Sequence, residues 1–93
     1  MSDIDWSMMV TAEMKEAAAA AALLEQVQAE IAGLRKVADD AIAPLQDAVD
    51  IDEATTDEEA RLKLWKKYRV ALSRVPEQGG YPEIIDWPAP PTD

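Results

Sequence analysis

The side chains that could carry out catalysis are few in this sequence, and their usual partners are absent. The chain contains no histidine and no cysteine, which removes the commonest general base and the thiolate nucleophile. Ser2, Ser7 and Ser73 therefore have no histidine that could activate them. The three glycines do not form a phosphate-binding loop, because two are adjacent and the third is distant. We expect a protein that is not an enzyme and that uses no cofactor.

Metal binding is the next chemistry to weigh, because carboxylates cluster ahead of residue 55. Asp47, Asp50, Asp52 and Glu53 could offer oxygen ligands to a calcium ion. An EF-hand loop starting at Asp50 would need a glycine at its sixth position and an acid at its twelfth, and the sequence has neither. We therefore expect no metal site.

Charge is distributed unevenly along the chain. The net charge is −10, yet residues 61–75 contain six basic residues and no acid. The overall negative charge disfavours nucleic acid and anionic membrane surfaces as partners. The basic segment either faces water and complements an acidic helix, or recognises an acidic surface on a partner. The sequence leaves both interpretations open.

The size and composition predict one small domain, residues 1–93, with a thin core. The chain has three tryptophans, two tyrosines and no phenylalanine, and alanine supplies much of its apolar content. Association with a partner or with itself would add the missing burial. No apolar run is long enough to span a bilayer, and Asp3 and Asp5 do not fit a signal peptide. We expect a cytoplasmic protein with no membrane partner.

The first predicted element is a long helix over residues 11–50. Its alanine run, residues 17–22, has the highest helix propensity available. Pro44 must kink this helix or make it restart. Within this helix, apolar residues recur at steps of three and four. This spacing is typical of the seam of a coiled coil and also of a helix packed in an ordinary hairpin: Leu24, Val27, Ile31, Leu34, Ala38, Ala41, Leu45 and Ala48.

A second helix is predicted over residues 56–75. Thr56 and Glu59 have the spacing of a capping box at its start, and Pro76 ends it. The predicted apolar stripe of this helix consists of Leu64, Trp65, Tyr68, Ala71, Leu72 and Val75. Leu62 and Val70 are predicted to lie outside this stripe. The basic residues fall mostly on the opposite side of this helix.

The remaining residues, 76–93, contain five of the six prolines and predict an extended tail that forms neither a helix nor a central strand. The predicted fold is therefore all-α: a long N-terminal helix and a shorter second helix, as an unequal hairpin or coiled coil, followed by a proline-rich tail. At 1.5 Å per residue the second helix covers the first only as far as about Glu30. The alanine run and Leu23, Leu24 and Val27 then need cover from the tail or from another chain.

Several segments of the second half, taken in order, resemble a known family. They are Ala54-Thr55-Thr56-Asp57-Glu58-Glu59, Leu64-Trp65-Lys66-Lys67-Tyr68-Arg69-Val70 and Arg74-Val75, flanked by Ile42-Ala43-Pro44-Leu45-Gln46-Asp47-Ala48-Val49 and Ile85-Asp86-Trp87-Pro88. At these separations they resemble the C-terminal region of bacteriophage tail-fibre assembly chaperones. The resemblance covers roughly residues 42–88.

The resemblance implies a protein that binds the C-terminal region of a phage tail fibre and helps its three chains to fold and associate. Such a protein acts in the cytoplasm of the host cell, and members of the family usually carry a further N-terminal region. An alternative hypothesis is a structural coiled-coil component that stays at the tail fibre or tail of the particle. Self-association would use residues 17–49. A mimic of nucleic acid is disfavoured by the basic segment.

Residues for partner binding are predicted on the second helix and in the tail. We expect Trp65 to belong mainly to the core, and Trp87 to contact the partner from an extended segment. The basic residues would orient an acidic partner at the rim of the interface. The full predicted set is Trp65, Lys66, Lys67, Tyr68, Arg69, Arg74, Tyr81, Ile84, Ile85, Asp86, Trp87 and Pro88.

Overall fold

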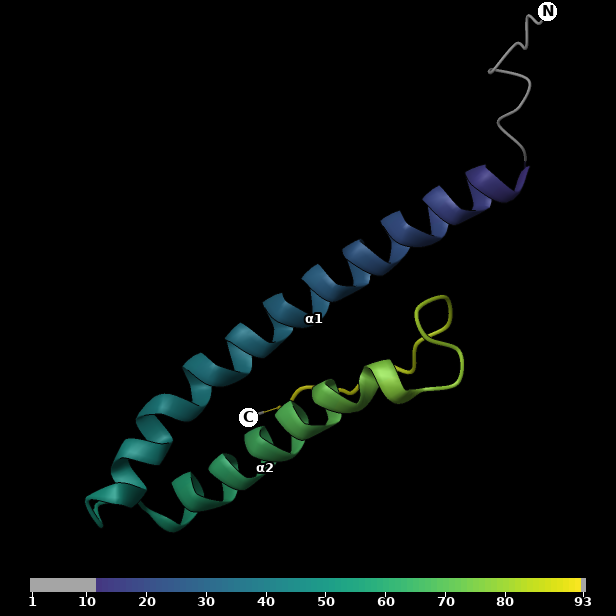
Figure 1. Cartoon of the computed structure of the whole chain (residues 1–93). Coiled ribbons are helices and arrows are strands. Elements are labelled where there is room, and N and C mark those ends of the chain that lie inside the picture. The colour runs from purple at the N-terminus through teal and green to yellow at the C-terminus, as the bar shows by residue number, and fades with distance from the viewer. Residues whose placement is uncertain (1–11, 93) are drawn as a thin grey trace, which may run out of the picture.

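The computed structural model describes residues 12–92, with side chains described from residue 17 onward. The elements are α1 (Ala12–Asp50), α2 (Thr56–Arg74) and the short 3₁₀ helix η1 (Val75–Glu77). Figure 1 shows α2 folding back antiparallel along the C-terminal part of α1. Residues 12–92 contain no strand, so the prediction of an all-α unequal hairpin is confirmed. The predicted first residue of the long helix, Thr11, lies outside the described range.

Pro44 does not interrupt α1. The helix continues through this proline to Asp50, so the predicted alternative of a restart is wrong. The proline ring displaces the hydrogen bond to the carbonyl of Asp40, and both residues lie on the exposed side, where water can solvate that carbonyl. Figure 1 shows the ribbon of α1 changing direction over its last turns, which is the response expected around a proline.

A compact turn of residues 51–55 reverses the chain. The amide of Glu53 donates to the carbonyl of Ala48 at 2.8 Å, and the amide of Asp52 donates to that of Val49 at 3.1 Å. Asp52 takes the left-handed conformation, with φ of 59°. Together these features form a Schellman motif, which satisfies two carbonyls at the end of α1. The hairpin therefore closes tightly at this end.

The capping box of α2 starts one residue earlier than predicted. The hydroxyl of Thr55 accepts from the amide of Glu58 at 3.1 Å, and the amide of Thr55 donates to the Glu58 carboxylate at 2.9 Å. The prediction of Thr56 and Glu59 is wrong, because the paired threonines and paired glutamates satisfy the same spacing in two registers. The short turn before α2 leaves Thr55 in the extended conformation that a cap requires.

The core of the hairpin consists of two small clusters on the facing sides of α1 and α2. Ala38, Tyr68 and Leu72 form one cluster, with Leu34 packed against it. The other cluster, closer to the turn, consists of Ile42, Leu45 and Leu62, with Val49 packed against it. Trp65 packs against both clusters and so joins them.

Two positions of the predicted stripes are displaced by one or two residues. On α1 the buried residue is Ile42 and not Ala41, because a helix with 3.6 residues per turn drifts by about 20° per heptad from a strict seven-residue repeat. On α2 Leu62 is buried, whereas Leu64 is 49% exposed. The predicted assignment of these two leucines is therefore wrong, since the stripe that meets α1 begins at Leu62.

The N-terminal part of α1 extends well beyond α2. All six alanines of residues 17–22 are exposed, as the length comparison predicts. Val27 is buried and Leu23 and Leu24 are half-buried, so these three do have cover, which the length comparison assigned to the tail or to another chain. The chain after α2 extends the covered length, because Val75 is fully buried and Glu83 lies beside Leu23.

Candidate partner-binding surface

The tail returns along α2 because one side chain closes the loop that precedes it. After η1 the chain turns through residues 78–84, and Gln78 then makes two hydrogen bonds with the backbone of Asp86. Further turns of the loop are closed by the amide of Ile84, which donates to the carbonyl of Gly80 at 2.8 Å. The prediction that the tail forms no helix is wrong for η1, where Pro76 occupies a first-turn position that tolerates proline.

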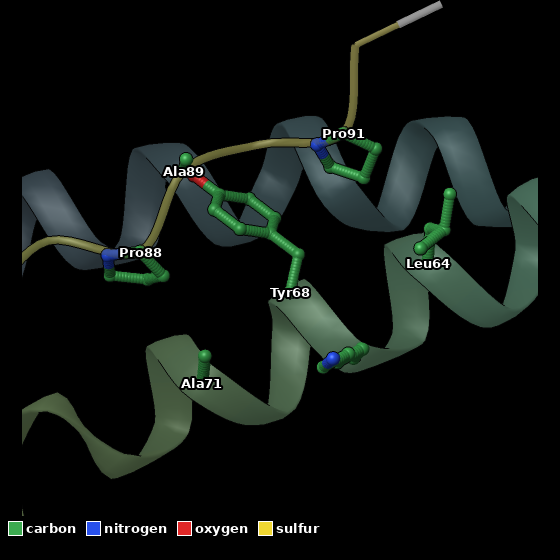
Figure 2. A pocket seen from close by; sticks show the side chains of 7 residues that line it. Leu64, Tyr68, Ala71, Pro88, Ala89 and Pro91 are labelled. Carbon is green, nitrogen blue, oxygen red and sulfur yellow. The ribbon is translucent and has the colours of Figure 1, made fainter.

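Residues 85–92 form an extended strap over α2, as the proline content predicts. Pro88, Ala89 and Pro91 lie above Tyr68 and beside Leu64. Figure 2 shows the ring of Tyr68 rising from α2 toward Ala89, between Pro88 and Pro91. A gap of about 270 Å³ is left between the strap and the helix. In the described part of the chain no hydrogen bond joins residues 87–92 to α2, so this contact is apolar.

The aromatic pair on α2 lies at the centre of the structure. Trp65 and Tyr68 are in edge-to-face contact, with ring centroids 5.9 Å apart and an interplanar angle of 80°. Trp65 is half-buried and packs against both core clusters. Tyr68 is only 4% exposed, because α1 covers it on one side and the strap on the other. Both residues therefore belong to the packing of the hairpin.

The basic residues of α2 separate into different structural roles. Arg69 forms an ion pair with Asp39 of α1 at 3.0 Å, which joins the two helices. Lys66 is half-buried, whereas Lys67 and Arg74 are exposed. Within residues 17–92 neither Lys67 nor Arg74 has a carboxylate within 4.0 Å. Of the two interpretations of the basic segment, Arg69 fits complementation of α1, and Lys67 and Arg74 fit an unoccupied surface.

Lys67 and Arg74 border a groove on the outer side of the strap. Its volume is about 380 Å³. Its lining consists of Lys67, Val70, Ala71, Arg74, Gln78, Asp86 and Pro88. The groove thus combines two cations, an exposed valine and the loop that Gln78 closes. We name it the Lys67–Arg74 groove.

The predicted anchors of the tail differ in their exposure. Ile84 is 77% exposed, and Asp86 is also exposed. Tyr81, Ile85, Trp87 and Pro88 are half-buried against the rest of the chain. The structure therefore brings Asp86 and Pro88 to the groove and leaves Ile84 open to solvent, while part of Trp87 is already covered.

Six residues that line these surfaces are absent from the predicted partner-binding set: Leu64, Val70, Ala71, Gln78, Ala89 and Pro91. Leu64, Tyr68 and Ala71 follow steps of four and three, so a second apolar stripe on α2 was detectable beside the one that meets α1. For Gln78 no signal exists in the sequence, because its partner is a backbone group eight residues away.

Two further features of the described residues concern metal binding and membranes. No group of acidic residues that could hold a metal ion occurs among the described residues. None of the described helices is long and apolar enough to cross a membrane. The described residues form a small helical hairpin that carries a basic, partly apolar groove, which is a kind of surface on which proteins bind partners.

The chain belongs to the Caudovirales tail fibre assembly protein family (lambda gpK), whose family model matches residues 2–92. The resemblance found in residues 42–88 is thereby confirmed and extends over almost the whole chain. This is a family of assembly factors and not of enzymes, in agreement with the expectation from the sequence.

Individual relatives agree with this assignment. A probable tail fiber assembly protein of Acyrthosiphon pisum secondary endosymbiont phage 1 is 41% identical over 69 residues, which cover 74% of this chain and 43% of the relative. The tail fiber assembly protein of Escherichia phage lambda is 52% identical over 58 residues, which cover 62% of this chain and 29% of the relative. The matches thus span less than half the length of these relatives. No solved structure matches the chain.

Proposed function

We propose that this chain is an assembly chaperone that binds the C-terminal region of a phage tail fibre and assists its folding and trimerisation. The family match over residues 2–92 is the observation that carries this proposal. The related proteins of phage lambda and of the aphid endosymbiont phage are named for tail fibre assembly. The proposed place of action is the cytoplasm of the host cell, where fibres are assembled before release.

The surface of the C-terminal half supports a binding role. Leu64, Val70 and Ile84 are large apolar residues that are between 45% and 77% exposed. Two cations that form no ion pair within residues 17–92 lie close to Val70 in the Lys67–Arg74 groove. Apolar residues with charged neighbours are typical of the surfaces that proteins use for partners. The predicted set of partner-binding residues in α2 and the tail is retained here as a proposal, with Trp65, Tyr68 and Arg69 assigned mainly to packing.

We also propose that self-association, if the chain forms an oligomer, uses the exposed side of α1 within residues 17–49. Residues 17–22 and Val37 leave apolar surface uncovered there. Light scattering on the purified chain, with and without the C-terminal fragment of the fibre, measures both kinds of association. A chain that stays monomeric and does not bind the fragment contradicts both self-association and fibre binding.

The experiment that tests the chaperone role is co-expression with the neighbouring fibre gene. Three forms of the chain are compared: the intact chain, a chain that ends at Gly80, and Trp87→Ala. The measured quantity is the yield of soluble, detergent-resistant fibre trimer. We expect the intact chain to raise this yield, and the chain without its strap to raise it less. An intact chain that gives no more trimer than the fibre gene alone contradicts the proposed function.

A permanent structural component of the particle is the second candidate, because the uncovered part of α1 offers a long side for lateral packing. Such a component must be present in finished particles at a fixed stoichiometry. Mass spectrometry of purified particles therefore separates the two candidates. Absence of the chain from the particles rules out the structural role, whereas its presence leaves assistance in folding possible.

A further inference from the structure

We infer that the Lys67–Arg74 groove binds an acidic segment in which an apolar residue lies between two carboxylates. The inference rests on the proposed function, since it specifies the chemistry of the fibre segment that the chain would recognise. It is carried by the arrangement of four residues on α2, by the charges that these residues leave unpaired, and by the loop that forms the opposite wall.

The spacing of the lining residues places an apolar patch between two cations. Lys67, Val70, Ala71 and Arg74 follow steps of three, one and three, which puts them on one side of α2. Lys67 and Arg74 are thus about 10 Å apart along the helix axis. Val70 lies between them and is 45% exposed. A ligand that fits both features needs an apolar group with a negative charge on each side.

The cations of the groove are not used by the hairpin itself. Within residues 17–92 the salt bridges are Arg69–Asp39 and Lys36–Asp40, and neither involves the groove. The carboxylate of Asp86 lines the groove but lies farther than 4.0 Å from both cations. The groove therefore holds two positive charges that stay available for a ligand, with one negative charge at its edge.

On the opposite wall of the groove, the backbone of Asp86 is not available for hydrogen bonds to a ligand. The amide and the carbonyl of Asp86 are both hydrogen-bonded to the side chain of Gln78. A ligand therefore meets side chains there and does not extend a backbone ladder. Recognition then depends on the charge and shape of the ligand side chains. Solvent-exposed ion pairs are weak and screened by salt, so the binding should be weak for a short peptide and should fall as salt rises.

The direct test uses a peptide probe and nuclear magnetic resonance. The probe is Ser-Thr-Asp-Thr-Ile-Thr-Asp-Thr-Ser, in which both aspartates and the isoleucine face the same side of an extended chain. The control peptide carries asparagine in place of both aspartates. Titrating the full isotope-labelled chain with the probe should shift the amide signals of Lys67, Val70, Ala71 and Arg74. The control peptide should shift them much less.

Matched variants separate the groove from general attraction between charges. Lys67→Gln and Arg74→Gln should each weaken binding of the probe roughly twofold to fivefold, which is the range for one exposed ion pair. Arg35→Gln removes the same charge from an exposed position of α1 and should leave binding unchanged. Asp86→Asn should tighten binding, because it removes a repelling carboxylate and keeps the backbone bonds to Gln78. Circular dichroism confirms that each variant is folded.

Four results would overturn the inference. The first is an absence of signal shifts at millimolar probe, and the second is a set of shifts that maps to α1 instead, as expected if the acidic probe binds elsewhere. The third is an equal effect of Arg35→Gln and Arg74→Gln. Shifts that depend on chain concentration without the probe would indicate that a second copy of the chain occupies the groove, which also contradicts it.

Co-expression with the fibre distinguishes failure of this inference from failure of the proposed function. If the intact chain raises the yield of trimer and the Lys67→Gln/Arg74→Gln double variant raises it equally, the function stands and the groove is not the binding element. If the intact chain itself gives no gain, the function fails, whatever the peptide titration shows.

Discussion

The side-chain amide of Gln78 pairs with the backbone of Asp86 as a neighbouring strand would. Its Nε2 donates to the carbonyl of Asp86 at 2.9 Å, and its Oε1 accepts from the amide of Asp86 at 2.8 Å. Beyond Asp86 the strap has only apolar contact with α2 within the described residues. This pair therefore fixes the start of the strap at Asp86, next to the loop that the amide of Ile84 closes on the carbonyl of Gly80.

Replacing Gln78 by alanine should free the tail without unfolding the hairpin. Both hydrogen bonds are lost, and we expect the local stability at Asp86 to fall by about 1–3 kcal/mol. Amide hydrogen exchange at Asp86 measures this directly and should become faster. Gln46→Ala is the control. It also removes a side-chain hydrogen bond, the one to Asp50, but at a position far from Asp86 in the sequence. Unchanged exchange at Asp86 in Gln78→Ala would contradict the assigned role of this pair.

The two adjacent glycines of the loop should respond differently to alanine. A Cβ at Gly80 would lie 2.7 Å from the carbonyl oxygen of Ile84, whereas a Cβ at Gly79 would meet nothing within 4 Å. Gly80→Ala must therefore shift the backbone of the loop and should lower the free energy of docking the tail by about 1 kcal/mol or more. Limited proteolysis after residue 80 should be faster in Gly80→Ala and unchanged in Gly79→Ala. Equal rates in the two variants would be the contrary result.

Leu62 and Leu64 provide a test of how α2 is rotated against α1. Leu62 is 7% exposed and packs with Ile42 and Leu45, so Leu62→Ala should cost about 2–4 kcal/mol of unfolding free energy. Leu64 is 49% exposed, and Leu64→Ala should cost less than about 1 kcal/mol. Urea unfolding followed by far-ultraviolet circular dichroism gives both values. A larger loss for Leu64→Ala would mean that the helix is rotated as the sequence pattern predicted.

Gly33→Ala should stabilise the protein. Gly33 lies inside α1, its side is exposed, and an added Cβ would meet nothing within 4 Å. Alanine is favoured over glycine in a helix by about 1 kcal/mol, because glycine loses more backbone entropy on folding. We expect a gain of that size in the free energy of unfolding, measured by thermal or urea denaturation. A loss of stability would show that residue 33 contacts another chain or a residue outside the described range.

The helices themselves were predictable because their causes are local. Alanine-rich sequence, a threonine three residues ahead of a glutamate, and Pro76 each act within a turn of the chain. The two adjacent threonines show a choice that the local sequence does not determine, namely which of them caps α2. Thr55 and Thr56 satisfy the same rule, and the choice between them depends on the Schellman turn that precedes α2.

The rotation of each helix and the path of the tail were not predictable in the same way. Whether Ala41 or Ile42 is buried depends on where α2 crosses α1, and therefore on contacts between residues far apart in the sequence. The family resemblance included the segment from Ile85 to Pro88, but it did not predict the path that the chain follows there. The start of that path depends on one hydrogen-bonded side chain, and glutamine occurs at too many surface positions to carry such a signal.

The unequal length of the two helices has a consequence for how the protein unfolds. Between Val27 and Asp50 one side of α1 is packed against the rest of the hairpin, so these turns unfold together with it. Residues 17–22 have no such packing and depend on the propensity of alanine alone, which supports only a marginal helix in water. Although α1 is geometrically one helix, we expect these two parts to unfold as separate cooperative units. Heating should therefore shorten α1 from its N-terminal side first. In a Trp6→Phe/Trp87→Phe variant, where Trp65 is the remaining tryptophan, total helicity should begin to fall before the fluorescence changes.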